Sequence, residues 1–411
     1  MKRLLKGRTV IGVIWTLVLF IIAFMYAMFQ GGFVSWFVFY SFLPILFYAL
    51  IINFYSLKDF KAEREIVNQS LQAEDTLQVK ITLTRKWRVP LFYLIVEDHL
   101  PDKLLKNQSG KTKGLFSVNF RKKIVLTYDI TSLPRGEYRL NEIVLKSGDI
   151  FGFIQKKISL ELEDTIIVYP RIRPLPHWFP ADHSAGGHHR SKKQFEHDLT
   201  AISSVRDYKP GDRLSWLDWK TTARTNKLVT KQFEFPLNRD VMVVLDRTRR
   251  SPSVSEQCFE RSVSLAASFI QRSLHVGSAA GLISVGERHT FFPLEESDQR
   301  PWQIQRHLAR TNMEGHLHPA PTIQAYLKRI PYQTTLLFVS QTIDDQLVAL
   351  FSECAYRGIT VRHYLVGNHE RLSNEQQWLL QSLPGMGIGS YLIDSGHFDE
   401  LLRAGGRRAT S

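Results

Sequence analysis

The densest group of side chains that could do chemistry lies between positions 205 and 224. It combines tryptophans with alternating acidic and basic residues, and its candidate partner-binding residues are Arg206, Tyr208, Asp212, Arg213, Trp216, Asp218, Trp219, Lys220 and Arg224. Tryptophan and arginine are frequent at the energetic hot spots of protein interfaces. Two interpretations stay open. The segment is a docking face for a partner, or its tryptophans are core and its charges form a local network that orders an interdomain segment.

No residue of this segment is placed as an obvious nucleophile with its base. The chain also contains no G-x-S-x-G, no H-E-x-x-H, no phosphate loop and no dinucleotide fingerprint. Its two cysteines, Cys258 and Cys354, form no C-x-x-C pair that would hold zinc. We therefore expect no catalytic residue and no cofactor. The alternative is a hydrolase of unknown substrate that acts at the edge of an α/β sheet.

Local signals predict how the backbone presents this segment. Pro210-Gly211 fits the centre of a type II turn, because proline fixes φ and glycine accepts a positive φ. Ser215-x-x-Asp218 resembles a capping box, which predicts the start of a short helix. That helix would have an apolar face and a basic face. The residues of the two faces are, in turn, Trp216, Trp219 and Ala223, then Lys220 and Arg224.

The amino-terminal stretch from Thr9 to Leu57 contains no Asp, Glu, Lys, Arg or His. It is long enough for two membrane spans of about 20 residues each. The turn-type residues Gln30-Gly31-Gly32 divide it into Thr9–Phe29 and Phe33–Phe54. A cleaved signal peptide is disfavoured because a second apolar segment follows at once. We expect a two-helix transmembrane hairpin.

Both flanks of the predicted hairpin, residues 1–57, are basic. The cations are Lys2, Arg3, Lys6 and Arg8 before it, and Lys58, Lys61 and Arg64 after it. Because positive residues favour the cytoplasmic side, we expect a multi-pass cell-membrane protein with a cytoplasmic N-terminus and cytoplasmic soluble domains. The net charge of +14 suits an anionic lipid surface. No nucleic-acid recognition motif accompanies this charge, so we expect no nucleic-acid partner.

In residues 58–170, apolar residues recur at every second position. Leu77, Val79, Ile81 and Leu83 alternate with polar residues, which is typical of a half-buried strand. Further short apolar runs follow at Leu91–Val96, Ile124–Tyr128, Tyr138–Leu145 and Ile166–Tyr169. Short strands at this spacing predict a small antiparallel β-sandwich. Residues 171–239 then form a linker that includes the segment described above.

Residues 240–411 alternate between continuous apolar runs and runs with helical periodicity. The apolar runs are Val241–Leu245, Ala280–Val285, Leu336–Val339 and Val361–Val366. Such runs are typical of parallel strands that are buried on both faces. The pattern predicts a doubly wound α/β domain, in which ligands bind at the carboxyl ends of the strands.

The run from Arg206 to Asp212, with Trp216–Lys220 and Thr222–Arg224 after it, resembles the hallmark of a bacterial family. This is the domain of unknown function 58 family, the YeaD-like proteins. Two earlier segments, Pro134–Tyr138 and Ser147–Gly152, also resemble segments of that family. The resemblance implies a carboxy-terminal domain similar to von Willebrand factor type A domains. Members of that family are commonly encoded beside two kinds of protein. The resemblance therefore implies a MoxR-type AAA+ ATPase, and possibly a transglutaminase-like membrane protein, as partners that this chain would bind.

Type A domains often hold Mg²⁺ through an Asp-x-Ser-x-Ser loop with a distant Thr and Asp. In this chain the corresponding loop is Asp246-Arg247-Thr248-Arg249-Arg250. Asp246 and Thr248 match the first two ligands, but Arg250 stands at the second hydroxyl, and a guanidinium repels a dication. No Asp directly follows the run 336–339, although Asp344 and Asp345 lie further on. We expect a degenerate site without functional Mg²⁺.

These observations and the resemblance predict a non-enzymatic, membrane-anchored adaptor or scaffold. Its cytoplasmic domains would dock a protein partner, the MoxR-type ATPase, in cell-envelope or complex assembly.

Overall fold

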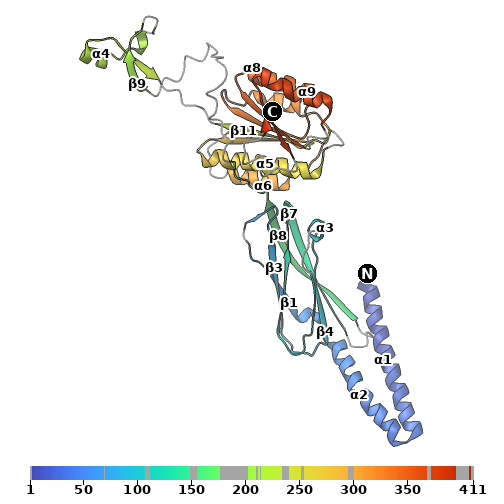
Figure 1. Cartoon of the computed structure of the whole chain (residues 1–411). Helices are drawn as coiled ribbons and strands as arrows, with labels where there is room; N and C mark the ends of the chain where they lie inside the picture. The colour runs from blue at the N-terminus through green and yellow to red at the C-terminus, as the bar shows by residue number, and fades with distance from the viewer. Residues whose placement is uncertain are drawn as a thin grey trace. The chain divides into compact units, whose positions relative to one another are not determined.

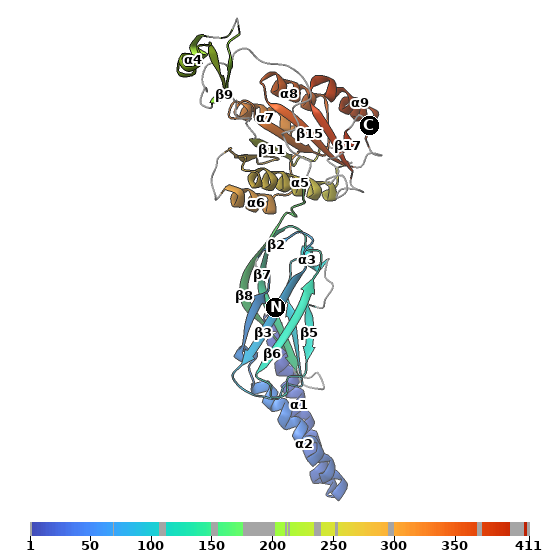
Figure 2. The same cartoon turned by 60° about the vertical axis from the view of Figure 1, so that its left-hand side comes forward.

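The computed structural model describes residues 2–68, 70–106, 112–148, 155–175, 202–209, 212, 214–233, 240–250, 254–294, 300–367, 372–394 and 407–408. The chain divides into two units, which are residues 1–172 with 302–311, and residues 173–301 with 312–411. Figures 1 and 2 show the elements of both units, and each unit is described by itself.

Two helices open the first unit, α1 (Lys2–Gln30) and α2 (Phe33–Phe54). Gly31 joins them with a φ of 60°, a left-handed conformation that glycine adopts without strain. The Phe39 ring packs against Phe20 and Phe24, at centroid distances of 5.6 and 5.7 Å. The described part of the chain contains no helix with the length and apolar character that a membrane span requires.

The rest of the first unit contains two β-sheets and two short helical turns, η1 (Leu57–Asp59) and α3 (Asp102–Leu105). One sheet has the order β1-β3-β6 and the other β2-β8-β7-β4-β5. Their bounds are β1 Phe60–Ile66, β2 Leu71–Gln72, β3 Leu77–Arg85, β4 Tyr93–Asp98, β5 Lys113–Phe116, β6 Lys123–Ile130, β7 Gly136–Gly148 and β8 Gln155–Tyr169. All pairs are antiparallel except β2 with β8, which is parallel.

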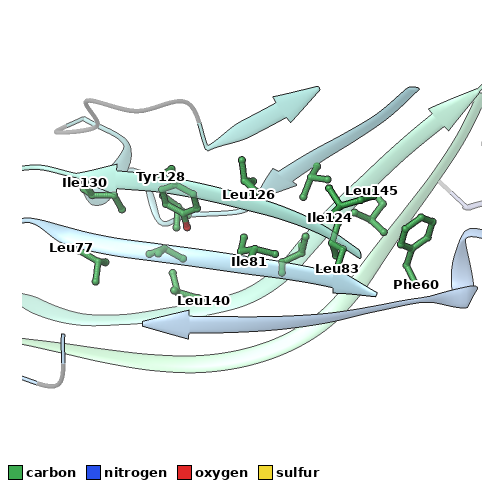
Figure 3. Packing of buried hydrophobic residues seen from close by; sticks show 14 of the residues in the cluster. Phe60, Leu77, Ile81, Leu83, Ile124, Leu126, Tyr128, Ile130, Leu140 and Leu145 are labelled. Carbon is green, nitrogen blue, oxygen red and sulfur yellow. The ribbon is translucent and has the colours of Figure 1, made fainter. Parts of the chain in front are cut away.

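The alternating residues of these strands form one buried core. Leu77, Val79, Ile81 and Leu83 point into it from β3, and Ile124 to Ile130 contribute every second residue from β6. Figure 3 shows Leu77, Ile81 and Leu83 of β3 and the four β6 residues together with Leu140 and Leu145 of β7. Because every second side chain of these strands is buried, the strands pack against one another through a shared apolar core.

The Arg64 side chain is buried inside this unit. Its buried guanidinium forms ion pairs with Asp98 and Asp164, each at 2.7 Å. The Tyr128 hydroxyl donates to the same Asp98 carboxylate. The Arg64 charge, one of the cations that follow the predicted hairpin, is thus paired within the β-structure.

The second unit contains a seven-stranded sheet with the order β13-β12-β11-β14-β15-β16-β17. The five strands in the middle of this order are parallel, and β13 and β17 are antiparallel to their neighbours. The strands are β11 Val241–Asp246, β12 Ala280–Val285, β13 Thr290–Phe292, β14 Thr335–Ser340, β15 Thr360–Gly367, β16 Gly389–Asp394 and β17 Arg407–Arg408.

Helices lie between these strands along the chain. In the second unit they are α5 Glu256–His275, α7 Pro319–Leu327, α8 Asp345–Tyr356 and α9 Asn374–Ser382, with the turn η5 at Leu383–Met386. The helix α6 (Arg300–Arg310) also falls between β13 and β14 along the chain, but from residue 302 onward it belongs to the first unit. Buried residues of α7, α8 and α9 form one cluster with alternate residues of β11 and β14. Figure 1 shows α5 on the other face of this sheet. The carboxyl ends of the parallel strands therefore meet at one edge of a sheet with helices on both faces.

Candidate functional site

The hallmark segment folds as a small hairpin with a helix between its strands. We call residues 202–209, 212 and 214–233 the hallmark hairpin. Its strands, β9 (Ile202–Asp207) and β10 (Val229–Phe233), are antiparallel, and Val229 lies opposite Asp207. The turn η3 (Leu214–Trp216) and the helix α4 (Trp219–Thr225) connect them. Leu217 forms an isolated bridge with Thr230, which brings the connection back onto β10.

Two carboxylates organise this hairpin. Asp212 accepts from the Arg206 guanidinium at 2.8 Å and from the Lys209 backbone N–H at 3.0 Å. The Arg206 bond, more than any other interaction, holds the pKa of the Asp212 carboxyl below its usual value. These bonds tie the end of β9 to the connection that follows it. Arg213 and the predicted turn Pro210-Gly211 lie outside the described residues.

Asp218 begins α4 as its N-cap. Its side chain accepts from the backbone N–H groups of Lys220 and Thr221, at 3.1 and 3.3 Å. The bond from the Thr221 backbone is the main cause of a lowered pKa for the Asp218 carboxyl. The predicted helix start at Ser215 is wrong, because residues 214–216 form a separate turn and Asp218 satisfies the free N–H groups of the helix.

The hairpin buries the side chains of Leu217 and Val229 and exposes that of Trp219. Trp219 is 66% exposed and Leu214 is 67% exposed. Lys220 and Arg224 are also exposed, whereas Arg206, Tyr208, Trp216 and Asp218 are half-buried. The interpretation of Trp219 as a core residue is therefore wrong. The hallmark hairpin therefore exposes one tryptophan and two cations on α4.

A second cluster lies at the carboxyl end of β11, and we call it the Arg250 cluster: Asp246, Thr248, Arg250, His318 and Asp344. Asp246 accepts from the backbone N–H and the hydroxyl of Thr248, at 2.9 and 2.6 Å. The Arg250 guanidinium donates to Asp246 at 2.9 Å, to Thr248 Oγ1 at 3.1 Å and to Asp344. One guanidinium therefore joins all three oxygen-bearing groups.

Asp344 comes to this cluster because β14 lies beside β11, with Val339 opposite Leu245. It also caps α8 by accepting from the Leu347 N–H at 3.0 Å, and it contacts His318 Nε2 at 3.0 Å. Burial raises the pKa of its carboxyl. The Leu347 bond, His318 and Arg250 together outweigh this effect and leave that pKa below its usual value. The Asp344 charge is thus a fixed part of the cluster.

The Arg250 cluster does not fit a divalent cation. Asp246 and Thr248 have the oxygen atoms that Mg²⁺ prefers, but both bind the Arg250 guanidinium, which carries a positive charge of its own. Within the described ranges, no three His, Cys, Asp or Glu side chains come together as a metal-binding group. The guanidinium makes the contacts that a cation would make at this strand end.

Ser340 of β14 and His363 of β15 are a serine and a histidine in contact, the residue types of a nucleophile and its base. Ser340 Oγ lies 2.9 Å from His363 Nε2, but it donates its own proton to the Thr342 carbonyl at 2.8 Å. Both residues are fully buried, and burial lowers the pKa of His363 to about 3. An inaccessible serine beside so weak a base is a structural pair.

Comparison with known proteins defines the class of this chain. The family model described as "Protein of unknown function DUF58" matches residues 204–369, which contain most of the hallmark hairpin and the Arg250 cluster. The chain is 38% identical over 307 residues to the uncharacterized protein YeaD of Bacillus subtilis (strain 168), over 74% of this chain and 75% of that protein. The chain therefore belongs to the DUF58 family.

Solved structures resemble it only weakly. Proximal thread matrix protein 1 of the mussel byssus is 10% identical, with a TM-score of 0.30 over 41% of this chain and 46% of that chain. A CARDB domain from Pyrococcus furiosus is 12% identical, with a TM-score of 0.17 over 25% of this chain and 91% of that chain. Scores this low do not define a shared fold.

Proposed function

We propose that this DUF58 protein is a membrane-anchored, non-enzymatic adaptor or scaffold that docks a protein partner through its hallmark hairpin. The observation that carries the proposal is the exposure of Trp219, Lys220 and Arg224 on the short helix α4. Tryptophan and arginine are enriched at interface hot spots. Other charged side chains of the hairpin have partners within it, since Arg206 forms an ion pair with Asp212 and Asp218 caps α4.

The partner we propose is the MoxR-type AAA+ ATPase that the family resemblance implies. The partner surface should be acidic, because exposed Lys209, Lys220, Arg224 and Lys227 all lie on the hallmark hairpin. A transglutaminase-like membrane protein is a further member of the proposed assembly. The parallel sheet of the second unit supports the idea of a type A-like domain in the same chain.

We also propose that residues 1–57 anchor the chain in the cell membrane as a helical hairpin, with the N-terminus and the soluble domains in the cytoplasm. The absence of charged residues from Thr9 to Leu57 and the lysines on both sides support this orientation. Reporter fusions at Met1 and after Asn68 should both be active only in the cytoplasm. A reporter that is active outside the cell would refute the orientation.

Reversing the two helix-surface charges tests the docking proposal. The variant Lys220→Glu with Arg224→Glu is expected to capture the ATPase much more weakly than the wild type, because both cations would then repel an acidic partner. Its thermal melting should stay within a few degrees of the wild type, since exposed helix charges contribute little to stability. The measurement is capture by the detergent-solubilised full chain with and without ATP.

A matched control uses the same charge change elsewhere. The variant Lys103→Glu with Lys106→Glu alters two exposed lysines, the first within α3 and the second directly after it. It should leave capture of the ATPase unchanged. Wild-type capture by the Lys220 and Arg224 variant would refute the role of the hallmark hairpin. Turnover on a substrate panel without an ATPase partner would favour the hydrolase alternative.

A further inference from the structure

Two loops of the first unit combine exposed aromatic and exposed basic side chains. We call residues 86–92 and 119–123 the aromatic–basic rim. Its exposed aromatic residues are Trp87, Phe92 and Phe120, and its exposed cations are Lys86, Arg88, Arg121, Lys122 and Lys123. Neither loop contains Asp or Glu. The rim is therefore uniformly positive and also exposes apolar surface to water.

Arg85 builds the rim from both loops. Its buried guanidinium donates to the carbonyls of Val89 at 2.6 Å, Asn119 at 2.6 Å and Arg121 at 2.8 Å. Leu91 and Asn119 also form a β-bridge. A guanidinium has its donors in one rigid plane, so these bonds hold the two loops side by side. The aromatic and basic side chains are thus presented by a fixed backbone.

The carboxyl end of α2 lies at the same rim. The Trp87 N–H donates to Asp59 at 2.9 Å, and the Phe92 N–H donates to the Tyr48 hydroxyl at 3.0 Å. Lys156 donates to the carbonyl of Ile52 in the last turn of α2 at 2.7 Å, and to that of Tyr55, directly after the helix, at 2.6 Å. In Figure 1, α2 meets the strands beside β1 and β4. Rim and helix end therefore form one surface of this unit.

A groove of about 840 Å³ lies between the helix end and the rim. Phe47, Ile51 and Phe54 line it from α2, Trp87 and Val89 line it from the rim, and Lys58 lies at its polar part. Phe54 and Trp87 are both largely exposed. The groove is apolar along the helix, and Lys58 and Asp59 both line it where the chain leaves the uncharged segment.

We infer that the aromatic–basic rim binds the headgroup layer of an anionic lipid bilayer, with Trp87 at the interface and an acyl chain in the groove. Tryptophan favours the headgroup level of a membrane. Basic residues close to an anionic surface each add to the attraction. The inference rests on the proposed membrane anchor, and continuity with the uncharged α2 favours a lipid over a protein as the occupant.

A probe at position 87 tests the inference in the full-length chain. Trp87→Cys is labelled with a fluorophore and reconstituted into vesicles of phosphatidylcholine, with and without phosphatidylglycerol. The native thiols of Cys258 and Cys354 are buried, so the folded chain should react at the new thiol. The matched control is Trp378→Cys, because the exposed fractions of Trp87 and Trp378 are 64% and 65%.

We expect acyl-chain nitroxide lipids to quench the label at 87 several-fold more than the label at 378, and most strongly in anionic vesicles. Adding Lys86→Glu and Arg88→Glu should lower that quenching. A chain that does not float with vesicles would overturn both the anchor and the rim. If the chain floats with the vesicles but the label at position 87 stays in water, the lipid contact of the rim is overturned and the anchor is not. Equal quenching in neutral and anionic vesicles would overturn the recognition of anionic lipid.

Discussion

Replacement of Arg250 by methionine is expected to destabilise the parallel-sheet domain by about 3–5 kcal/mol, the usual effect of breaking a buried ion pair. Asp246 is only 3% exposed, and the substitution would leave its carboxylate without the guanidinium that now binds it. The unfolding of this domain can be followed by thiol labelling in urea. The two cysteines of the chain, Cys258 on α5 and Cys354 on α8, are both buried there.

A second substitution separates this electrostatic effect from lost packing. Asp246→Asn in the Arg250→Met background removes the unpaired charge, so much of the lost stability should return. If Arg250→Met instead exposes both thiols at the urea concentration of the wild type, the Arg250 cluster contributes no stability.

The same arginine should decide the response to metal. Wild-type thiol exposure should not change with millimolar Mg²⁺, whereas Arg250→Ser completes an Asp-x-Thr-x-Ser loop and should gain protection. A ligand at ten times its Kd stabilises the folded state by about 1.4 kcal/mol. Saturable protection of the wild type by Mg²⁺ that Asp246→Asn abolishes would show that the site binds metal despite Arg250.

A pH-dependent loss of stability should arise from His363. Its pKa falls from 6.5 to about 3 because the folded protein buries the imidazole. The unfolded chain therefore takes up a proton below pH 6.5 that the folded chain refuses. The stability contribution is complete above pH 6.5 and is lost as the pH falls towards 3. At pH 5 the expected loss is about 2 kcal/mol.

His363→Gln isolates this effect, since glutamine does not titrate and keeps a donor for Ser340. The comparison is the urea concentration at which Cys354 becomes reactive, measured at pH 7.5 and pH 5 for both proteins. The wild type should lose about 2 kcal/mol more than the variant between these pH values. Equal losses would contradict a buried neutral imidazole.

Sequence patterns were informative where burial alone decides the residue type. Val241–Leu245 and Leu336–Val339 are continuous apolar runs because both faces of β11 and β14 are covered by protein. The first half of β8, from Gln155, was missed, since its alternating residues are only half-buried and charged residues surround them. Arg64 could not be recognised as buried, because its partners Asp98 and Asp164 are distant in the chain.

The candidate sites show the same limit. Asp246, Thr248 and Arg250 were identified by comparing one loop with the type A motif that the family resemblance implies, whereas the contact with Asp344 depends on β14 lying next to β11. Helical spacing grouped Trp216 with Trp219, but it could not tell which side of α4 faces the hairpin. Ser215 and Asp218 are both good capping residues, so only the fold of residues 214–217 decides between them.

The most direct test of the docking claim places a photo-cross-linking amino acid at position 219 of the full chain in cells. Trp219 is exposed on the hallmark hairpin, so a docked partner should be captured there, and mass spectrometry would identify it. The control places the same photo-cross-linking amino acid at position 378, where the chain has another exposed tryptophan. The account predicts a cross-link to a MoxR-type AAA+ ATPase from position 219 and none from 378. Equal capture from both positions, or no protein partner at 219, would contradict it.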